Sequence, residues 1–71
     1  MSDQNPYILR YFTSHHLPER LQAVSKPFAA LAQEVADTLP AGDERSTCLR
    51  KILEAKDCAV RAALHLPGED R

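Results

Sequence analysis

Five side chains in the N-terminal part of the chain combine positive charge with aromatic rings. They are Arg10, Tyr11, Phe12, His16 and Lys26. Nucleotides are bound by such sets, because bases stack on rings and phosphates accept charge-assisted hydrogen bonds from cations. The alternative is that Tyr11 and Phe12 belong to the hydrophobic core and that Lys26 is an ordinary solvated side chain. The residue types alone leave both interpretations open.

Motifs for catalysis or metal binding are missing from the sequence. Two glycines, at positions 42 and 68, do not make a glycine-rich phosphate loop. Histidines 15 and 16 are adjacent and a third is remote at position 65, which is a poor arrangement for chelating a metal. Cys48 and Cys58 are ten residues apart and do not form a CxxC pair. We therefore expect no catalytic residues, no metal site and no cofactor.

Size and charge narrow the range of partners. The 71 residues are enough for one domain, 1–71. Nine basic and ten acidic residues give a net charge of −1, which argues against a DNA-coating protein but allows a small anionic ligand.

No apolar run reaches membrane-spanning length, and the N-terminus does not resemble a signal peptide. Two cysteines separated by about 15 Å of helical rise cannot form a disulfide, and unpaired thiols are typical of a reducing cytosol.

Prolines and apolar spacing predict an all-α fold. Asn5-Pro6 is a helix start, with asparagine as the cap, and it opens a short helix over Tyr7–Phe12 inside an N-terminal segment, 1–17. A second helix is predicted over 18–39, kinked at Pro27. Its apolar residues recur at steps of three and four: Leu21, Val24, Phe28, Leu31, Val35 and Leu39.

A short turn connects this helix to the last one. Residues 40–43 form the turn, and Asp43 can cap a third helix over 44–66 that ends at Pro67-Gly68. So short a link between two long helices predicts an antiparallel helical hairpin. On the third helix Asp57 and Arg61 are spaced for a favourable pair.

The predicted hairpin has more apolar surface than one helix pair can bury. The third helix carries two apolar stripes: Leu49, Ile52, Ala59 and Ala63 in one, and Leu53, Val60 and Leu64 in the other. This surplus on so small a chain favours an oligomer. The alternative is that the N-terminal helix folds over its own hairpin and covers the surplus.

The segment from His16 to Leu64 resembles a phage family of small helical-hairpin proteins. These are sponge proteins that counter bacterial cyclic-oligonucleotide-based antiphage signalling (CBASS), and their hairpin domain is shared with sponges of the Thoeris defence signal. The matching features are the leucine-proline start, the mid-helix proline, the turn "LPAGDE" and the stretch "LRKILEAKDCAVRA". The resemblance covers about two-thirds of the chain, and the order and spacing of these pieces carry it.

The resemblance implies a non-enzymatic function in the cytoplasm of the bacterial host. Members bind cyclic dinucleotides such as 3′,3′-cGAMP, and in several cases cyclic trinucleotides at separate pockets, and hold them intact. The host effector is then starved of its activating signal. The family implies a hexamer, a trimer of dimers with pockets between protomers. Its dinucleotide-binding tyrosine and lysine match Tyr11 and Lys26, although Tyr11 lies outside the matching segment.

Symmetry offers a physical reason for such a site. A 3′,3′-linked cyclic dinucleotide has two phosphates and is nearly two-fold, and a two-fold interface presents each residue twice. A kink at Pro27 would let Lys26 aim its ammonium group at a phosphate while its stem covers apolar neighbours. The competing class is a non-enzymatic helical interaction module, an adaptor that docks its apolar stripes on a host protein.

Overall fold

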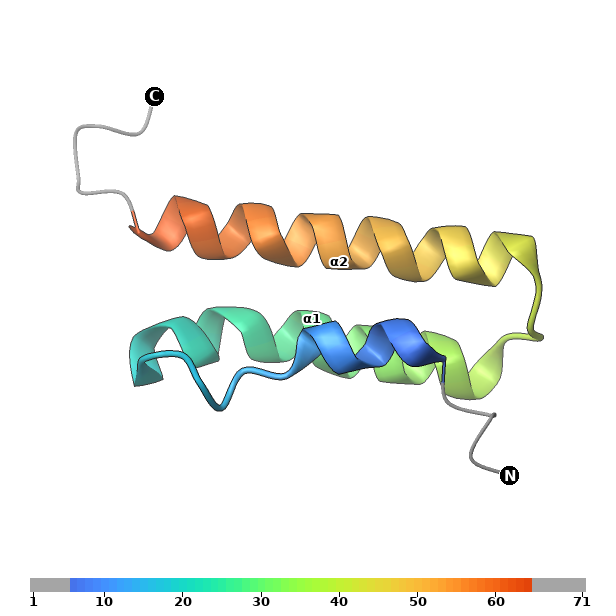
Figure 1. Cartoon of the computed structure of the whole chain (residues 1–71), viewed down its shortest axis with the longest axis horizontal. Coiled ribbons are helices and arrows are strands. Elements are labelled where there is room, and N and C mark those ends of the chain that lie inside the picture. Colours follow the sequence, from blue (N-terminus) through green and yellow to red (C-terminus); the bar gives the residue numbers. More distant parts are fainter. Residues whose placement is uncertain (1–5, 65–71) are drawn as a thin grey trace.

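Two long helices of a computed structural model lie side by side and antiparallel (Figure 1). They are α1, Glu19–Thr38, and α2, Asp43–Leu64, and a short 3₁₀ helix, η2, Tyr7–Phe12, packs against both. The structure describes residues 6–64, and within that range the chain has no strand. The predicted all-helical hairpin is thereby confirmed. The expected cap Asn5 and the expected stop Pro67-Gly68 lie outside the described residues.

The helix ends follow the proline and glycine positions closely. Pro18 precedes the first helical residue of α1, where its missing N–H costs no hydrogen bond. The helix then continues through Pro27, which confirms one helix across the proline, while a kink at that point stays a prediction. Gly42 ends the turn with a φ of +156°, a backbone conformation that other residues rarely adopt.

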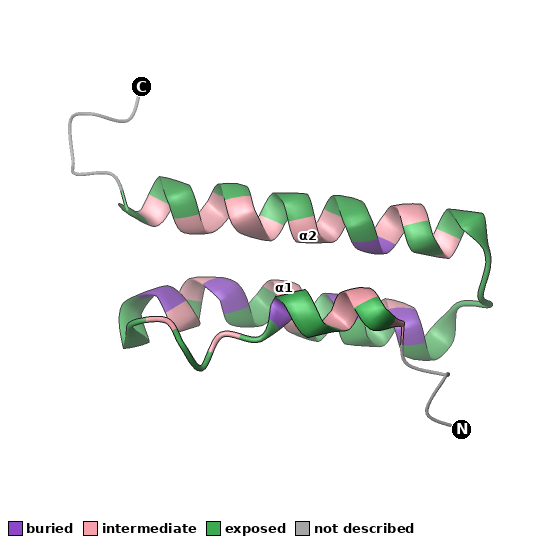
Figure 2. Cartoon of the chain, in the orientation of Figure 1, coloured by how far each residue is buried: buried purple, intermediate pink, exposed green. Residues whose placement is uncertain are grey.

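The buried face of α1 differs from the stripe that its large apolar residues predict. Its buried residues are Leu21, Ser25, Ala32 and Ala36, which are purple in Figure 2. By contrast, Leu31 and Leu39 remain 49% and 46% exposed. Ala32 lies in a buried cluster with Phe12 of η2 and Leu49 of α2, so the core face of α1 is the face that these two elements cover, and Leu31 and Leu39 fall outside it. The predicted stripe is therefore rotated from the true core face.

The partner helix is buried even less. Within α2, whose residues are all described, Leu49 is the one fully buried residue. The two predicted stripes are mostly half-buried, and Leu64 is 55% exposed. The radius of gyration is 13.6 Å, against about 11 Å expected for a compact domain of this length. The chain is therefore elongated, and its hydrophobic core is small.

Two arginines hold the hairpin together at its ends. Arg20 Nη1 donates a hydrogen bond of 2.8 Å to the Ala63 carbonyl at the end of α2. Arg45 Nη1 donates to the carbonyls of Ala36 and Leu39, at 3.0 and 3.2 Å, at the end of α1. The last carbonyls of a helix have no partner inside it and carry partial negative charge. Each long helix therefore supplies an arginine that caps carbonyl groups at the C-terminal end of the other helix.

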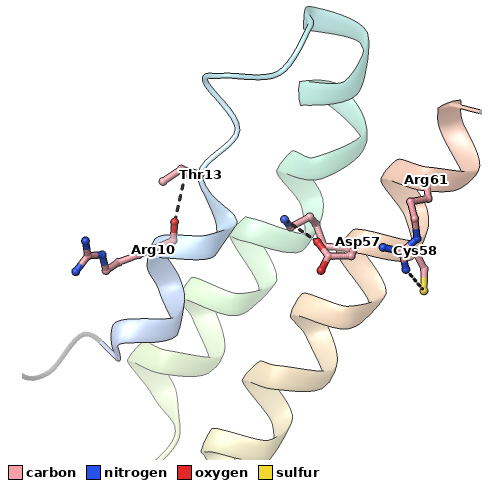
Figure 3. A network of polar contacts seen from close by, with 6 residues as sticks. Arg10, Thr13, Asp57, Cys58 and Arg61 are labelled. Atoms are coloured by element: carbon pink, nitrogen blue, oxygen red, sulfur yellow. Dashed lines mark hydrogen bonds and ion pairs between the residues drawn. The ribbon is translucent and has the colours of Figure 1, made fainter.

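The polar side chains near the end of α2 pair differently from the sequence expectation (Figure 3). Asp57 forms an ion pair of 3.0 Å with its neighbour Lys56, and Arg61 Nη2 contacts Cys58 Sγ at 3.4 Å. The predicted Asp57–Arg61 pair is therefore wrong. Cys48 and Cys58 are both free thiols. Of the helices described, none combines the length and the apolar character needed to cross a membrane.

Ser25 is a point of weakness in the helix interface. Its side chain is 0% exposed, and its Oγ has no hydrogen-bond partner among the described residues. A buried hydroxyl without a partner costs free energy, and serine is a poorer helix former than alanine. We expect Ser25→Ala to raise the free energy of unfolding by about 1 kcal/mol. Urea unfolding followed by circular dichroism measures this, with the exposed Ser46→Ala as control. A less stable Ser25→Ala protein would contradict the argument.

Candidate functional site

The six-residue helix η2 has three edges, and two of them carry residues that pack on the hairpin. A 3₁₀ helix has three residues per turn, so residues three apart lie above one another. Leu9 and Phe12 share one edge, and Ile8 and Tyr11 share the second, on which Ile8 packs against the core. Tyr7 and Arg10 share the third edge. The sequence predicts a short helix here, and a segment of this length adopts the tighter 3₁₀ form because it is too short for a stable α-helix.

Phe12 anchors η2 to the hairpin. Its ring is 4% exposed and forms a cluster with Ala32 of α1 and Leu49 of α2. Lys56 Nζ lies 6.0 Å from the centroid of the Phe12 ring, and its side chain is 13% exposed. This burial favours the core interpretation of Phe12 over direct stacking on a ligand. Phe12 therefore holds η2 on the hairpin, and its expected role as a ligand-binding residue stays a prediction.

The two tyrosine rings of η2, Tyr7 and Tyr11, are exposed to solvent. Tyr7 is 64% exposed and Tyr11 is 55% exposed, and their ring centroids are 6.0 Å apart in an edge-to-face arrangement. The Arg10 guanidinium carbon lies 4.4 Å from the centroid of the Tyr7 ring, in a cation–π contact. In Figure 3 the Arg10 side chain extends away from both long helices. We call Tyr7, Arg10 and Tyr11 the η2 cluster.

Lys26 lies on the flank of α1 that η2 follows. Gln33 and Arg10 line one pocket, so η2 runs beside the Gln33 side of α1. Lys26 is seven residues before Gln33, two helical turns away on the same flank, and it is exposed. Because η2 runs opposite to α1, the end that carries Tyr11 points toward the first turns of α1 (Figure 1). Lys26 and the η2 cluster therefore share one side of the molecule.

His16 occupies the connector between η2 and α1. It is exposed, and its ring lies 5.9 Å from that of His15 in an edge-to-face contact. Within the described residues, no hydrogen bond, ion pair or ring contact joins His16 to Lys26 or to the η2 cluster. The described part of the chain also contains no group of three potential metal ligands.

No protein family, curated protein or solved structure matches this chain. Of the five expected residues, the structure exposes Arg10, Tyr11, His16 and Lys26 and buries the fifth.

Tyr7 is the residue that the sequence reasoning missed. Read with a three-residue period, the segment Tyr7–Phe12 would have shown Tyr7 beside Arg10. Tyr7 is exposed and contacts the Arg10 cation, so it offers the pairing of ring and positive charge for which Tyr11 was selected from the sequence.

Proposed function

We propose that this protein is a non-enzymatic sponge that binds cyclic oligonucleotide second messengers and so blocks CBASS effectors in the host cytoplasm. One observation carries the proposal. Two tyrosine rings, more than half exposed, stand beside an arginine that forms no hydrogen bond or ion pair through its guanidinium within the described residues. Rings kept out of a small core at a cost in buried apolar area are available to stack on bases. The resemblance to the phage sponges points to the same ligand class.

The roles of the residues follow from their exposure and charge. Tyr11 stacks on a base, and Lys26 and Arg10 contact phosphates. His16, on the exposed connector, adds a hydrogen-bond donor at the margin. The sequence carries no recognisable motif for a catalytic nucleophile, a metal site or a phosphate loop, so we expect the ligand to be held intact. Cyclic dinucleotides are the first ligands to test, and cyclic trinucleotides the second.

The decisive experiment measures binding and the fate of the ligand together. Calorimetric titration with 3′,3′-cGAMP is expected to show saturable binding. Heating the complex and separating the supernatant by chromatography is expected to return intact ligand. Linear products that increase with protein and time would identify an enzyme instead. If neither a cyclic dinucleotide nor a cyclic trinucleotide binds, the adaptor alternative takes precedence.

We further propose that the chain assembles into a hexamer, a trimer of dimers. The motivation is the exposed apolar surface of an elongated chain, with Leu31, Leu39 and Leu64 about half exposed. Light scattering coupled to size-exclusion chromatography is expected to give six times the chain mass of 7.9 kDa. A mass near that of one chain at micromolar concentration would contradict the assembly and with it the two-fold site.

A further inference from the structure

An open pocket lies between η2 and α1, next to the η2 cluster. Its volume is about 390 Å³, which is in the range of small-molecule sites. The lining combines apolar, aromatic, cationic and amide groups: Pro6, Leu9, Tyr7, Arg10 and Gln33. Such a mixture fits a ligand that is flat and apolar in one part and charged in another.

Arg10 is the one charged residue among the described residues that line this pocket, and its side chain extends away from both long helices (Figure 3). The contact with Tyr7, 4.4 Å from guanidinium carbon to ring centroid, is the one interaction of its side chain among the described residues. A guanidinium that lies against a ring still has its N–H groups in its own plane, and this fork matches two oxygens of a phosphate. Because the ring also limits the motion of the arginine, less entropy is lost when a phosphate binds.

The opposite wall carries an amide in a defined orientation. Gln33 Nε2 donates a hydrogen bond of 3.0 Å to Asp37 Oδ1, one turn further along α1. Gln33 lines the pocket from the side of α1, and Pro6 and Leu9 supply apolar surface for a base plane.

We propose that this pocket is a second nucleotide subsite, which takes a nucleobase against Tyr7 and its phosphate on Arg10. The inference rests on the proposed function and extends it. The Tyr7 and Tyr11 rings are neighbours at 6.0 Å, so one ring can serve each of two bases. The base in the pocket either belongs to the cyclic oligonucleotide bound at Tyr11 or comes from a separate nucleotide.

Calorimetry on the full chain separates these sources, with 3′,3′-cGAMP and with 5′-AMP and 5′-GMP as probes. Arg10→Gln and Tyr7→Ala test the pocket, and Arg50→Gln, an exposed arginine on α2, is the matched control. If the base is part of the cyclic ligand, both pocket variants lose about tenfold or more in cGAMP affinity and the mononucleotides do not bind. If it is a separate nucleotide, a mononucleotide binds wild type and Lys26→Ala but not Arg10→Gln.

Two results would overturn the subsite. One is wild-type affinity of both pocket variants for every probe, with cGAMP still bound, which removes the role of Arg10 at a phosphate but leaves binding of the cyclic ligand at Tyr11 and Lys26 standing. The other is no binding of any probe by wild type, which removes the subsite and, if a cyclic trinucleotide also fails to bind, the proposed function. Mononucleotide binding that depends on Arg10, without any binding of cGAMP or of a cyclic trinucleotide, would support the pocket and refute the sponge. Circular dichroism confirms that each variant is folded.

Discussion

Lys26→Ala is expected to lower the affinity for a 3′,3′-linked cyclic dinucleotide by about 10- to 150-fold, the equivalent of roughly 1.5–3 kcal/mol for one charge-assisted contact. In a two-fold site both copies are lost at once, so the deficit can approach twice that free energy. The side chain is exposed on α1 and makes no hydrogen bond or ion pair among the described residues. Its loss should therefore leave folding nearly unchanged.

The measurement is calorimetric titration of wild type and variant, with helicity and assembly mass determined for both. Lys51→Ala is the matched control, because Lys51 is also an exposed lysine, on α2. Its affinity should equal that of wild type, which separates a placed cation from a general effect of net charge. A folded, assembled Lys26→Ala protein that binds as tightly as wild type would show that the proposed site is in the wrong place.

Phe12→Ala is expected to destabilise the protein and to abolish cyclic-dinucleotide binding indirectly, because η2 loses its contact with the hairpin. The ring is buried in the cluster with Ala32 and Leu49, and its truncation costs about 3–5 kcal/mol of the free energy of unfolding. The contacts of η2 with the hairpin centre on this ring, so η2 should detach and take the η2 cluster with it. Phe12→Leu, which retains much of the apolar volume, is the milder variant if alanine prevents folding.

Intrinsic fluorescence reports this detachment directly. The chain has no tryptophan, and its two tyrosines, Tyr7 and Tyr11, both lie on η2. A fall in tyrosine anisotropy with retained helicity of α1 and α2 would show that η2 is released. The contrasting variant is Tyr11→Ala, which should lose roughly 1–3 kcal/mol of binding free energy but little stability, because the ring is 55% exposed. Equal thermal stability of Phe12→Ala and wild type would contradict the anchoring role.

The helices, their order and the hairpin could be predicted from the sequence. These depend on local signals: prolines at helix starts, Gly42 in the turn and apolar steps of three and four. The sequence also pointed to Arg10, Tyr11 and Lys26, since charge and ring type can be read from single residues. Which helix faces meet depends on packing between elements that are distant in the sequence. Helical periodicity defines a stripe but not its rotation, and here the cluster with Phe12 and Leu49 places Ala32 on the core side of α1.

The same limit applies to the candidate site. Phe12 and Tyr11 are adjacent aromatic residues, and no local rule says which of them faces the core. The 3₁₀ geometry of η2 places Phe12 and Tyr11 on different edges. Phe12 turns inward to pack against Leu49 of the distant helix α2, and Tyr11 remains exposed. Gln33 and Tyr7 meet across one pocket although 26 positions separate them, because packing and not sequence spacing brings η2 onto that flank of α1.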